Sequence, residues 1–224
     1  MTEATQIIVT LEPGPTAHSR LAAVLAAVPI ATVVVMPPAG GVLDATTARP
    51  LVEAAQKADV AALIASDAAL ARTLRADGVF LPWTADPLAA YGEAREVLGT
   101  RFIVGAGGGT LRHDAMSLAE AGAEFVAFGL DTPTDTTTDC EGLDPEEAAI
   151  QRFEAIDWWA EIFQVPCVAL DVTTAEDARA LAAAGADFLA LPLPTALAPA
   201  DVAAYVAALA AAAALGSQDR RVEA

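Results

Sequence analysis

The chain has 224 residues, of which 55% are hydrophobic, and it carries a formal net charge of −18 at pH 7. This length allows a sizeable buried core, and such an acidic chain is unsuited to binding the phosphate backbone of a nucleic acid. The longest uncharged run, residues 21–43, contains three prolines and two glycines, which break it into a helix and a strand and exclude a membrane span there.

Short apolar runs rich in β-branched residues alternate along the chain with longer alanine-rich runs. The short runs are apolar almost throughout, as expected for strands that are buried on both faces of a parallel sheet. The alanine-rich runs have helical length, and several begin with Asp, Thr or Ser, which favour helix N-caps. Strands are expected at residues 6–11, 31–36, 60–65, 78–81, 101–106, 124–129, 167–172 and 188–193, with helices between them.

One junction between a helix and the next strand recurs four times. In KADVAAL, RADGVFL, AGAEFVAF and AGADFLAL, a small residue ends the helix, an acidic residue follows, and a strand begins. Gly122 and Gly185 suit a left-handed C-cap that turns the chain tightly into the strand. The acidic residues of the four junctions are Asp59, Asp77, Glu124 and Asp187.

Eight strands, each followed by a helix, predict an α/β protein with the (β/α)8 (TIM) barrel fold. We assign residues 1–215 to a single barrel domain and residues 216–224 to a polar C-terminal tail. An open, doubly wound sheet is the structural alternative. It usually has fewer strands, and no glycine-rich dinucleotide fingerprint follows the first strand here.

Both ends of the chain favour a soluble protein. The first ten residues, MTEATQIIVT, lack the basic segment that begins a secretory signal. The run VAAYVAALAAAAAL near the C-terminus is short and alanine-rich for a membrane span. We therefore expect a cytoplasmic protein that has neither a membrane nor a nucleic acid as a partner.

In a (β/α)8 barrel, functional residues lie at the C-terminal ends of the strands and in the loops that follow. Those loops contain no Lys or Arg in this sequence. The glycine run at residues 105–110, GAGGGT, offers backbone amides to an anion, although a flexible strand-to-helix turn has the same pattern. The segment at residues 129–144, GLDTPTDTTTDCEGLD, has no hydrophobic period and gathers threonines and aspartates directly after an expected strand. Both segments therefore point to this edge of the barrel as the place of a site.

The other residues able to carry chemistry form no known motif. His18 and His113 lack the spacing of metal ligands, and Cys140 and Cys167 are expected to be free thiols. The two tryptophans at 158–159 lie in a helical run, where packing is the first interpretation and stacking on a ligand is the alternative. The sequence has no Ser/His/Asp, HExxH or Walker pattern.

The segment at residues 60–81, VAALIASDAALARTLRADGVFL, resembles the thiamine phosphate synthase family. Family members have a strand ending in Asn-Asp, then a helix, then Asp-Gly-Val-His-Leu; Ser66-Asp67 and residues 77–81 stand at these places. The family patterns Gly-Pro-x-Phe-Pro-Thr-x-Thr-Lys and Pro-Val-Val-Ala-Ile-Gly-Gly lie along residues 129–137 and 166–172. The resemblance, which holds in order over about residues 30–195, implies a barrel enzyme that uses Mg²⁺ to join a pyrimidine diphosphate to a thiazole phosphate.

The resemblance assigns roles to residues at the strand ends. It implies a metal-binding role for Asp67, aided by Asp86, which lies close to the family's second metal-binding aspartate without aligning cleanly. Asp67 also suits the N-cap of a helix that begins at Ala68, so both roles stay open. The segment after the sixth strand holds the thiazole phosphate in the family. Candidate substrate-binding residues are Ser66, Gly107, Gly108, Gly129, Thr134 and Thr136.

The sequence departs from the family at each basic or imidazole side chain. The lysine of the Thr-rich segment is Thr137, the histidine after the fourth strand is Phe80, and the Gly-Gly after the seventh is Asp171-Val172. The Gln-x-Arg-x-Lys after the second strand falls on the apolar VVVMPP, and the serine and threonine after the fifth strand fall in the glycine run. Because cations stabilise a departing diphosphate, these losses predict weak or altered catalysis.

These observations predict a thiamine phosphate synthase-like protein with lost or altered activity, whose expected ligands are a small phosphorylated molecule and Mg²⁺. A non-catalytic barrel that binds a small molecule or a partner protein is the main alternative. A Schiff-base aldolase is disfavoured, because the sole lysine, Lys57, ends a helix. The sequence leaves a homo-oligomer open.

Overall fold

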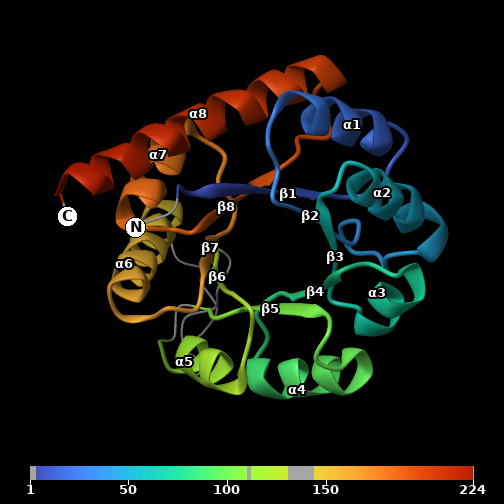
Figure 1. Ribbon diagram of the computed structural model, residues 1–224, viewed down its shortest axis with the longest axis horizontal. Helices are drawn as coiled ribbons and strands as arrows, with labels where there is room; N and C mark the ends of the chain where they lie inside the picture. Colours follow the sequence, from blue (N-terminus) through green and yellow to red (C-terminus); the bar gives the residue numbers. More distant parts are fainter. Residues whose placement is uncertain (1–3, 110–111, 131–143, 224) are drawn as a thin grey trace.

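The computed structural model describes residues 4–109, 112–130 and 144–223. In this part of the chain, eight parallel strands close into a barrel, with each strand next to its sequence neighbours and β1 paired with β8 (Figure 1). The predicted (β/α)8 barrel is therefore confirmed. The strands are β1 (Gln6–Leu11), β2 (Thr32–Val35), β3 (Ala61–Ala65), β4 (Gly78–Leu81), β5 (Ile103–Gly107), β6 (Val126–Phe128), β7 (Cys167–Ala169) and β8 (Phe188–Pro192).

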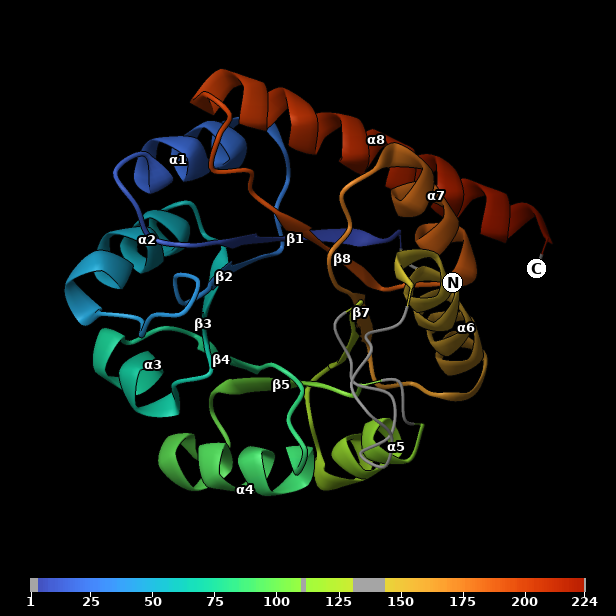
Figure 2. The same cartoon turned by 180° about the vertical axis from the view of Figure 1, so that it is seen from behind.

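A helix follows each strand, and the helices surround the barrel as an outer ring (Figures 1 and 2). The side chains of Asp44, Asp67, Asp86 and Thr174 accept backbone N–H groups at the starts of α2, α3, α4 and α7, as N-caps do. The helices are α1 (Ala17–Ala27), α2 (Ala45–Lys57), α3 (Ala68–Leu74), α4 (Pro87–Leu98), α5 (Arg112–Ala121), α6 (Pro145–Ile162), α7 (Ala175–Ala184) and α8 (Pro199–Glu223).

Apolar side chains fill both the space between sheet and helices and the interior of the barrel. Because side chains alternate along a strand, every second residue points into the barrel. Phe80 of β4 and Phe125, just before β6, stack there with ring centroids 6.2 Å apart. A side chain at Gly105 would place its Cβ 1.9 Å from the Phe125 ring, so this glycine makes room for the ring. The interior cluster comprises Ile8, Val34, Leu63, Ala65, Phe80, Phe125, Ala127, Val168 and Ala190.

The recurring acidic junctions lie at the N-terminal face of the barrel, where the strands begin. The carboxylates of Asp77, Glu124 and Asp187 each accept the N–H of a residue at the start of the preceding strand, at 2.7–2.8 Å. Each carboxylate thus joins consecutive βα units and satisfies a backbone donor at the end of the sheet. Gly122 and Gly185 have the left-handed φ angles of 94° and 108° that a C-cap requires.

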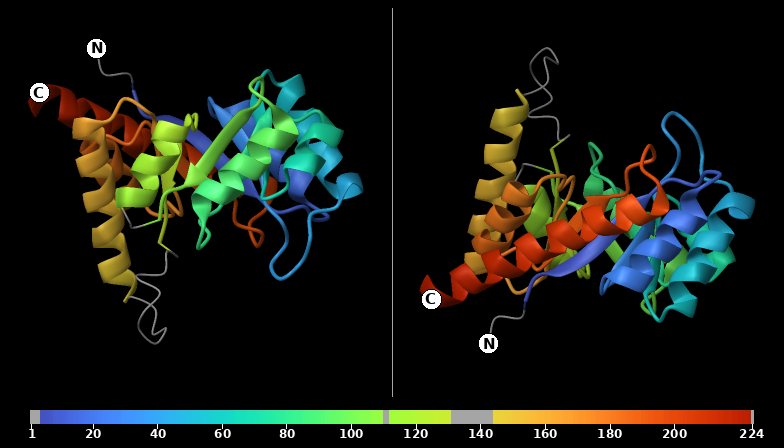
Figure 3. Two further views of the ribbon diagram at one scale, coloured as in Figure 1. Left: turned by 90° about the horizontal axis from the view of Figure 1, so that it is seen from below. Right: turned by 90° about the horizontal axis from the view of Figure 1, so that it is seen from above.

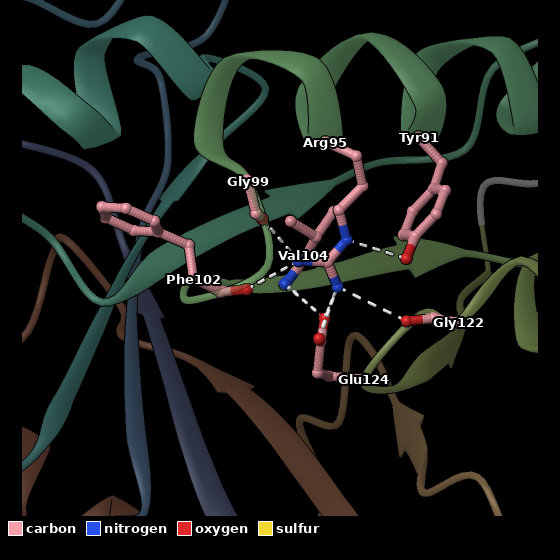
Figure 4. A network of polar contacts seen from close by, with 7 residues as sticks. All are labelled: Tyr91, Arg95, Gly99, Phe102, Val104, Gly122 and Glu124. Atoms are coloured by element: carbon pink, nitrogen blue, oxygen red, sulfur yellow. Dashed lines mark hydrogen bonds and ion pairs between the residues drawn. The ribbon is translucent and has the colours of Figure 1, made fainter.

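Arg95 of α4 is the centre of a polar network at this face (Figure 4). Its guanidinium donates to the carbonyl oxygens of Gly99 and Phe102 at 3.1 and 2.8 Å and to both carboxylate oxygens of Glu124. Burial acts to lower the pKa of Arg95, but the hydrogen bonds to Glu124 and Tyr91 outweigh it and raise this pKa above its usual value. The network joins α4, the start of β5 and the turn before β6.

The C-terminal residues differ from the sequence-based expectation. Residues 216–224 were predicted to be a polar tail, whereas residues 216–223 form the last turns of α8, which packs against α7 and α1. Two contacts explain the difference. The Ser217 hydroxyl donates to Thr5 Oγ1 at 2.9 Å, and Arg220 donates to the carbonyl oxygen of Ala184 at 3.0 Å. The end of α8 therefore belongs to the barrel.

Gly216 lets α8 approach the backbone of α7, and replacing it by alanine should destabilise the protein. A Cβ at this position would lie 2.1 Å from the carbonyl oxygen of Arg179. Gly92 of α4 provides the matched control, because a Cβ there would have no atom within 4 Å. Urea unfolding should show that Gly92→Ala stabilises by up to ~1 kcal/mol through helix propensity and that Gly216→Ala destabilises. Stabilisation by both substitutions would show that α8 does not need this close approach.

Among the described residues, α8 is the one helix long and apolar enough to cross a membrane by length and composition alone. Its most apolar 18-residue window has a mean hydropathy of 1.6, and 33% of that window is buried within the molecule. The buried side chains of Val202, Val206 and Leu209 belong to the main core, which identifies α8 as the eighth helix of the barrel.

Candidate active site at the C-terminal rim

The loops after β3 and β7 share an uncommon backbone conformation. Ser66 has a φ of 67° and Asp171 a φ of 60°, both in the left-handed region that non-glycine residues seldom adopt. These are the positions at which the family resemblance places an asparagine and a glycine, the two residue types most at ease in that region. The course of both loops therefore fits the family pattern, although the side chains differ.

The two metal-ligand candidates are both helix caps. Asp67 Oδ1 accepts the N–H of Leu70 at 2.7 Å, and Asp86 Oδ1 accepts the N–H of Ala89 at 3.0 Å. Each carboxylate thus has a structural role at the start of α3 or α4, and each retains its second oxygen. No group of three or more His, Cys, Asp or Glu side chains suited to a metal occurs among the described residues. The metal role of Asp67 and Asp86 stays a prediction.

Two substitutions at Asp67 separate capping from metal binding. Asp67→Ser keeps a capping oxygen and should leave stability within a few tenths of a kcal/mol, whereas Asp67→Ala should lose ~1 kcal/mol. If Asp67 only caps α3, calorimetric titration with Mg²⁺ should give the same result for wild type and Asp67→Ser. Loss of Mg²⁺ binding in Asp67→Ser, with stability retained, would assign the carboxylate to the metal.

The glycines of the predicted substrate site are constrained by packing. A Cβ at Gly107 would lie 2.6 Å from the backbone nitrogen of Trp83, and one at Gly108 would lie 2.9 Å from the Cβ of Ala115 in α5. The N–H of Gly108 donates to the carbonyl oxygen of Ala127 at 2.9 Å, so it is engaged in the sheet and not open to an anion. An anion-binding role for Gly107 stays a prediction.

A carboxylate stands beside the predicted position of the thiazole phosphate. Asp171 Oδ2 accepts the N–H of Leu130 at 3.3 Å, and it would lie 3.1 Å from a Cβ at Gly129. The two loops that follow β6 and β7 are thus joined by a negatively charged side chain. Such a charge opposes the approach of a phosphate to Gly129. Thr134 and Thr136 lie outside the described residues.

Two buried arginines reach the rim from helices, and analysis of the loop sequences alone missed both. Arg152 of α6 donates to the carbonyl oxygen of Leu170, after β7, and to both oxygens of Asp177 at 2.7 Å. Arg20 of α1 donates to the carbonyl oxygen of Pro194, after β8, at 2.6 Å. Both are 2% exposed, and the Nε of each has no partner. The signal in the sequence that could have identified them is an arginine on the face of a helix that is otherwise apolar and buried.

Other residues singled out in the sequence have structural surroundings. His18 and His113 are exposed on α1 and α5. Trp159 is fully buried and stacks on Phe163 with ring centroids 4.1 Å apart, so its packing role is confirmed. Cys167 is a free thiol whose burial raises its pKa to about 12, which makes it a poor nucleophile at neutral pH. Cys140 lies outside the described residues.

Two grooves lie on the outer surface, away from the rim candidates. One, of about 570 Å³, runs between α7 and α8 beside Arg179 and Leu215. The other, of about 390 Å³, lies between the loop after β1 and α2, beside His18 and Pro50. Neither is lined by a residue to which the family resemblance assigns a role.

The fold and the placement of these residues define the class: a (β/α)8 barrel with its candidate site at the C-terminal rim. Residues 42–192 match the model of the family described as thiamine monophosphate synthase. The chain therefore belongs to the thiamine monophosphate synthase family.

Curated proteins named thiamine-phosphate synthase are similar to this chain. Those of Erythrobacter litoralis, Hyphomonas neptunium and Rhodospirillum centenum are 38%, 42% and 41% identical to it. The alignments cover 66%, 61% and 64% of this chain. They span 65%, 57% and 62% of the relatives, which is less than two thirds of the length of each.

Solved structures support the fold. A thiamine phosphate pyrophosphorylase from Pyrococcus furiosus matches with a TM-score of 0.68 and 17% identity, over 93% of this chain and 95% of that one. A tryptophan synthase structure from Mycobacterium tuberculosis matches with a TM-score of 0.63 and 16% identity, over 97% and 93% of the two chains. At these identities the likeness concerns the barrel alone.

Proposed function

We propose that the protein binds small phosphorylated substrates at the C-terminal rim and joins a pyrimidine diphosphate to a thiazole phosphate slowly. The observation that carries this proposal is the backbone conformation of the loops after β3 and β7, in a chain that belongs to this family. Ser66 and Asp171 hold left-handed conformations at the two positions that the family fills with Asn and Gly. A cytoplasmic location belongs to the proposal, because the relatives are named as synthases of a metabolite.

Mg²⁺ belongs to the proposal as the family's metal. Magnesium is commonly held by one or two carboxylates together with substrate phosphates, without a full protein cage. Asp67 and Asp86, which follow β3 and β4, each keep one carboxylate oxygen beyond the one used as a cap, so this donor set suits such an ion. When bound, Mg²⁺ would supply positive charge to a departing diphosphate.

Among the described residues, the rim offers little uncommitted positive charge, and slow transfer is proposed for this reason. The guanidinium of Arg112, at the start of α5, lies over the ring of Trp158, 4.5 Å from its centroid. The charge of Arg152 is balanced by Asp177, and its guanidinium is committed to the loop after β7. Arg20 is 98% buried and already holds the loop after β8. Neither Arg152 nor Arg20 therefore replaces the cations that the family directs at the two phosphorylated substrates. What the chain's own residues supply is orientation, through the loops after β3 and β7.

The test is product formation by the full chain. The protein is incubated with a pyrimidine diphosphate, a thiazole phosphate and Mg²⁺, and thiamine phosphate is followed by mass spectrometry against heat-denatured protein. Product that depends on folded protein and disappears when Mg²⁺ is chelated supports the proposal. Absence of product over long incubation, at high protein concentration, overturns it.

A non-catalytic binding protein is the second candidate, and Asp171 favours it. The Asp171 carboxylate beside Gly129 disfavours a phosphate there and leaves the rim better suited to a neutral or cationic molecule. Calorimetry with the thiazole phosphate and with its unphosphorylated alcohol distinguishes the two candidates. Tighter binding of the alcohol, without product formation, would favour the binding protein.

A further inference from the structure

A charged side chain lies on the buried face of α6. The buried residues of this helix are Ala148, Arg152, Ile156 and Trp159, at steps of four, four and three residues that place them on one face. The helix packs against β7 and α7, and Figure 3 shows it along the side of the barrel beside α7. The Arg152 side chain is 1% exposed. Because a buried charge is costly unless it is paired and hydrogen-bonded, the contacts of Arg152 define its role.

The guanidinium of Arg152 holds both ends of the segment that joins β7 to α7. One of its terminal nitrogens donates to the carbonyl oxygen of Leu170, the first residue after β7. The other donates to both carboxylate oxygens of Asp177, in the first turn of α7, at 2.7 Å. Because the Leu170 carbonyl points toward α6, the N–H of Asp171 in the same trans peptide points the opposite way. Arg152 therefore fixes the orientation of the peptide that leads into Asp171.

Asp171 needs this support because its backbone conformation is unfavourable. Its φ of 60° lies in the left-handed region, where a residue with a side chain is strained unless the surrounding structure holds it. In this conformation Oδ2 accepts the N–H of Leu130 at 3.3 Å and would lie 3.1 Å from a Cβ at Gly129. Relaxation of φ to an ordinary negative value would turn the side chain in another direction, and the contact with the loop after β6 would be lost.

We propose that Arg152 is a positioning residue that keeps the Asp171 carboxylate beside Gly129, where this carboxylate selects an uncharged ligand group over a phosphate. The inference rests on the proposed use of the rim as the binding site. A fixed negative charge repels a phosphate and leaves a hydroxyl group unaffected. The positive charge of Arg152 does not offset this repulsion, because it is balanced by Asp177. Arg152 is buried, so it acts on the ligand through Asp171 and not by contact.

Amide hydrogen exchange of the full chain, followed by NMR, tests the positioning role without a ligand. The double variant Arg152→Met/Asp177→Asn removes the buried ion pair and leaves the net charge unchanged. It should speed up exchange of the Leu130 N–H several-fold, because Asp171 no longer accepts this group. Asp171→Asn keeps a side-chain oxygen as the acceptor and should leave the exchange rate of Leu130 unchanged.

Arg20→Met is the matched control for the loss of a buried arginine. Arg20 is as buried as Arg152 and also holds a rim loop, through the carbonyl oxygen of Pro194 at 2.6 Å. Its substitution should leave the exchange of Leu130 unchanged. If the double variant does not fold, Arg152→Lys replaces it, because lysine keeps the charge but lacks the forked guanidinium, and the same faster exchange is expected. Unchanged exchange of Leu130 in the folded variant overturns the proposal.

Calorimetric titration with the thiazole phosphate and with its unphosphorylated alcohol tests the selection. Asp171→Asn and the double variant should each raise the affinity for the phosphate, relative to the alcohol, several-fold. Combining them should give no further change, because both act through one carboxylate. Arg20→Met should leave the ratio of affinities unchanged. Additive effects, or a lower ratio in the double variant, would contradict the proposal. If neither thiazole binds, the proposed function is wrong and the selection falls with it, whereas the exchange of Leu130 still decides the positioning role.

Discussion

Diphosphate release from a pyrimidine diphosphate should be about 10⁻³ s⁻¹ or slower when the protein is supplied with the thiazole phosphate and Mg²⁺. A typical enzyme turns over at ~10 s⁻¹, and removal of one well-placed donor costs ~10²–10³ in rate. The family's lysine and histidine positions are Thr137 and Phe80 here, and its basic run after β2 is apolar. At least two such losses act together, so a fall of ~10⁴ or more is expected even though the effects are not additive.

The released diphosphate is hydrolysed by an added diphosphatase, and the phosphate formed is measured over time. A reaction without the protein is the blank. Phe80→His provides an internal comparison, because it returns the family's residue to the wall of the barrel. It should leave the rate within about tenfold of wild type, since a single residue cannot restore the cluster. Wild-type turnover within about tenfold of ~10 s⁻¹ would contradict the expectation. It would mean that backbone donors such as the N–H of Gly107 replace the missing cations.

Arg95→Met should destabilise the protein by about 2–4 kcal/mol. The methionine keeps much of the apolar stem but removes every donor of the guanidinium. The carbonyl oxygens of Gly99 and Phe102 would lose a partner, and the Glu124 carboxylate would lose its counter-charge. Each such loss costs ~1–3 kcal/mol where water does not replace the donor, and the partial exposure of Glu124 reduces the total.

Urea unfolding of wild type, Arg95→Met and Tyr91→Phe measures the effect. Tyr91→Phe removes only the hydroxyl that accepts from Arg95 Nε at 2.9 Å, so it should cost ~1 kcal/mol or less. Glu124→Gln retains an acceptor for the N–H of Val104 and should fall between the two. A loss below about 1 kcal/mol in Arg95→Met would show that water satisfies these carbonyl groups and that the network contributes little.

The strands were predictable because each is a short apolar run, although β6 (Val126–Phe128) and β7 (Cys167–Ala169) are shorter than the expected 124–129 and 167–172. The expected strand at 78–81 has the observed bounds of β4, and the expected strand at 6–11 has those of β1. The end of the chain was mispredicted because residues 216–223 are polar in sequence, while their place in α8 depends on contacts with α7 and Thr5. Those contacts join residues far apart in the chain, which local composition does not encode.

The candidate site was less accessible to sequence reasoning than the fold. The family pattern located the loops after β3 and β7. The sequence also allowed Asp67 to be the N-cap of a helix, and the structure confirms this cap. It missed Arg20 and Arg152, because both belong to helices and reach the rim only after the barrel closes. It also gave no sign that the amide of Gly108 is committed to the sheet, which depends on the pairing of β5 with β6.

The acidic junctions carry an evolutionary consequence. The carboxylates of Asp77, Glu124 and Asp187 accept backbone N–H groups where the strands begin. These contacts lie at the opposite end of the barrel from the candidate active site. Mutations at the active-site end that spare its helix caps and tightly packed glycines therefore leave these contacts intact and cost little of the marginal stability on which folding depends. Selection can relax on the chemistry while it continues to act on the scaffold. A lineage of such barrels can lose or exchange its catalytic groups and still inherit a stable fold.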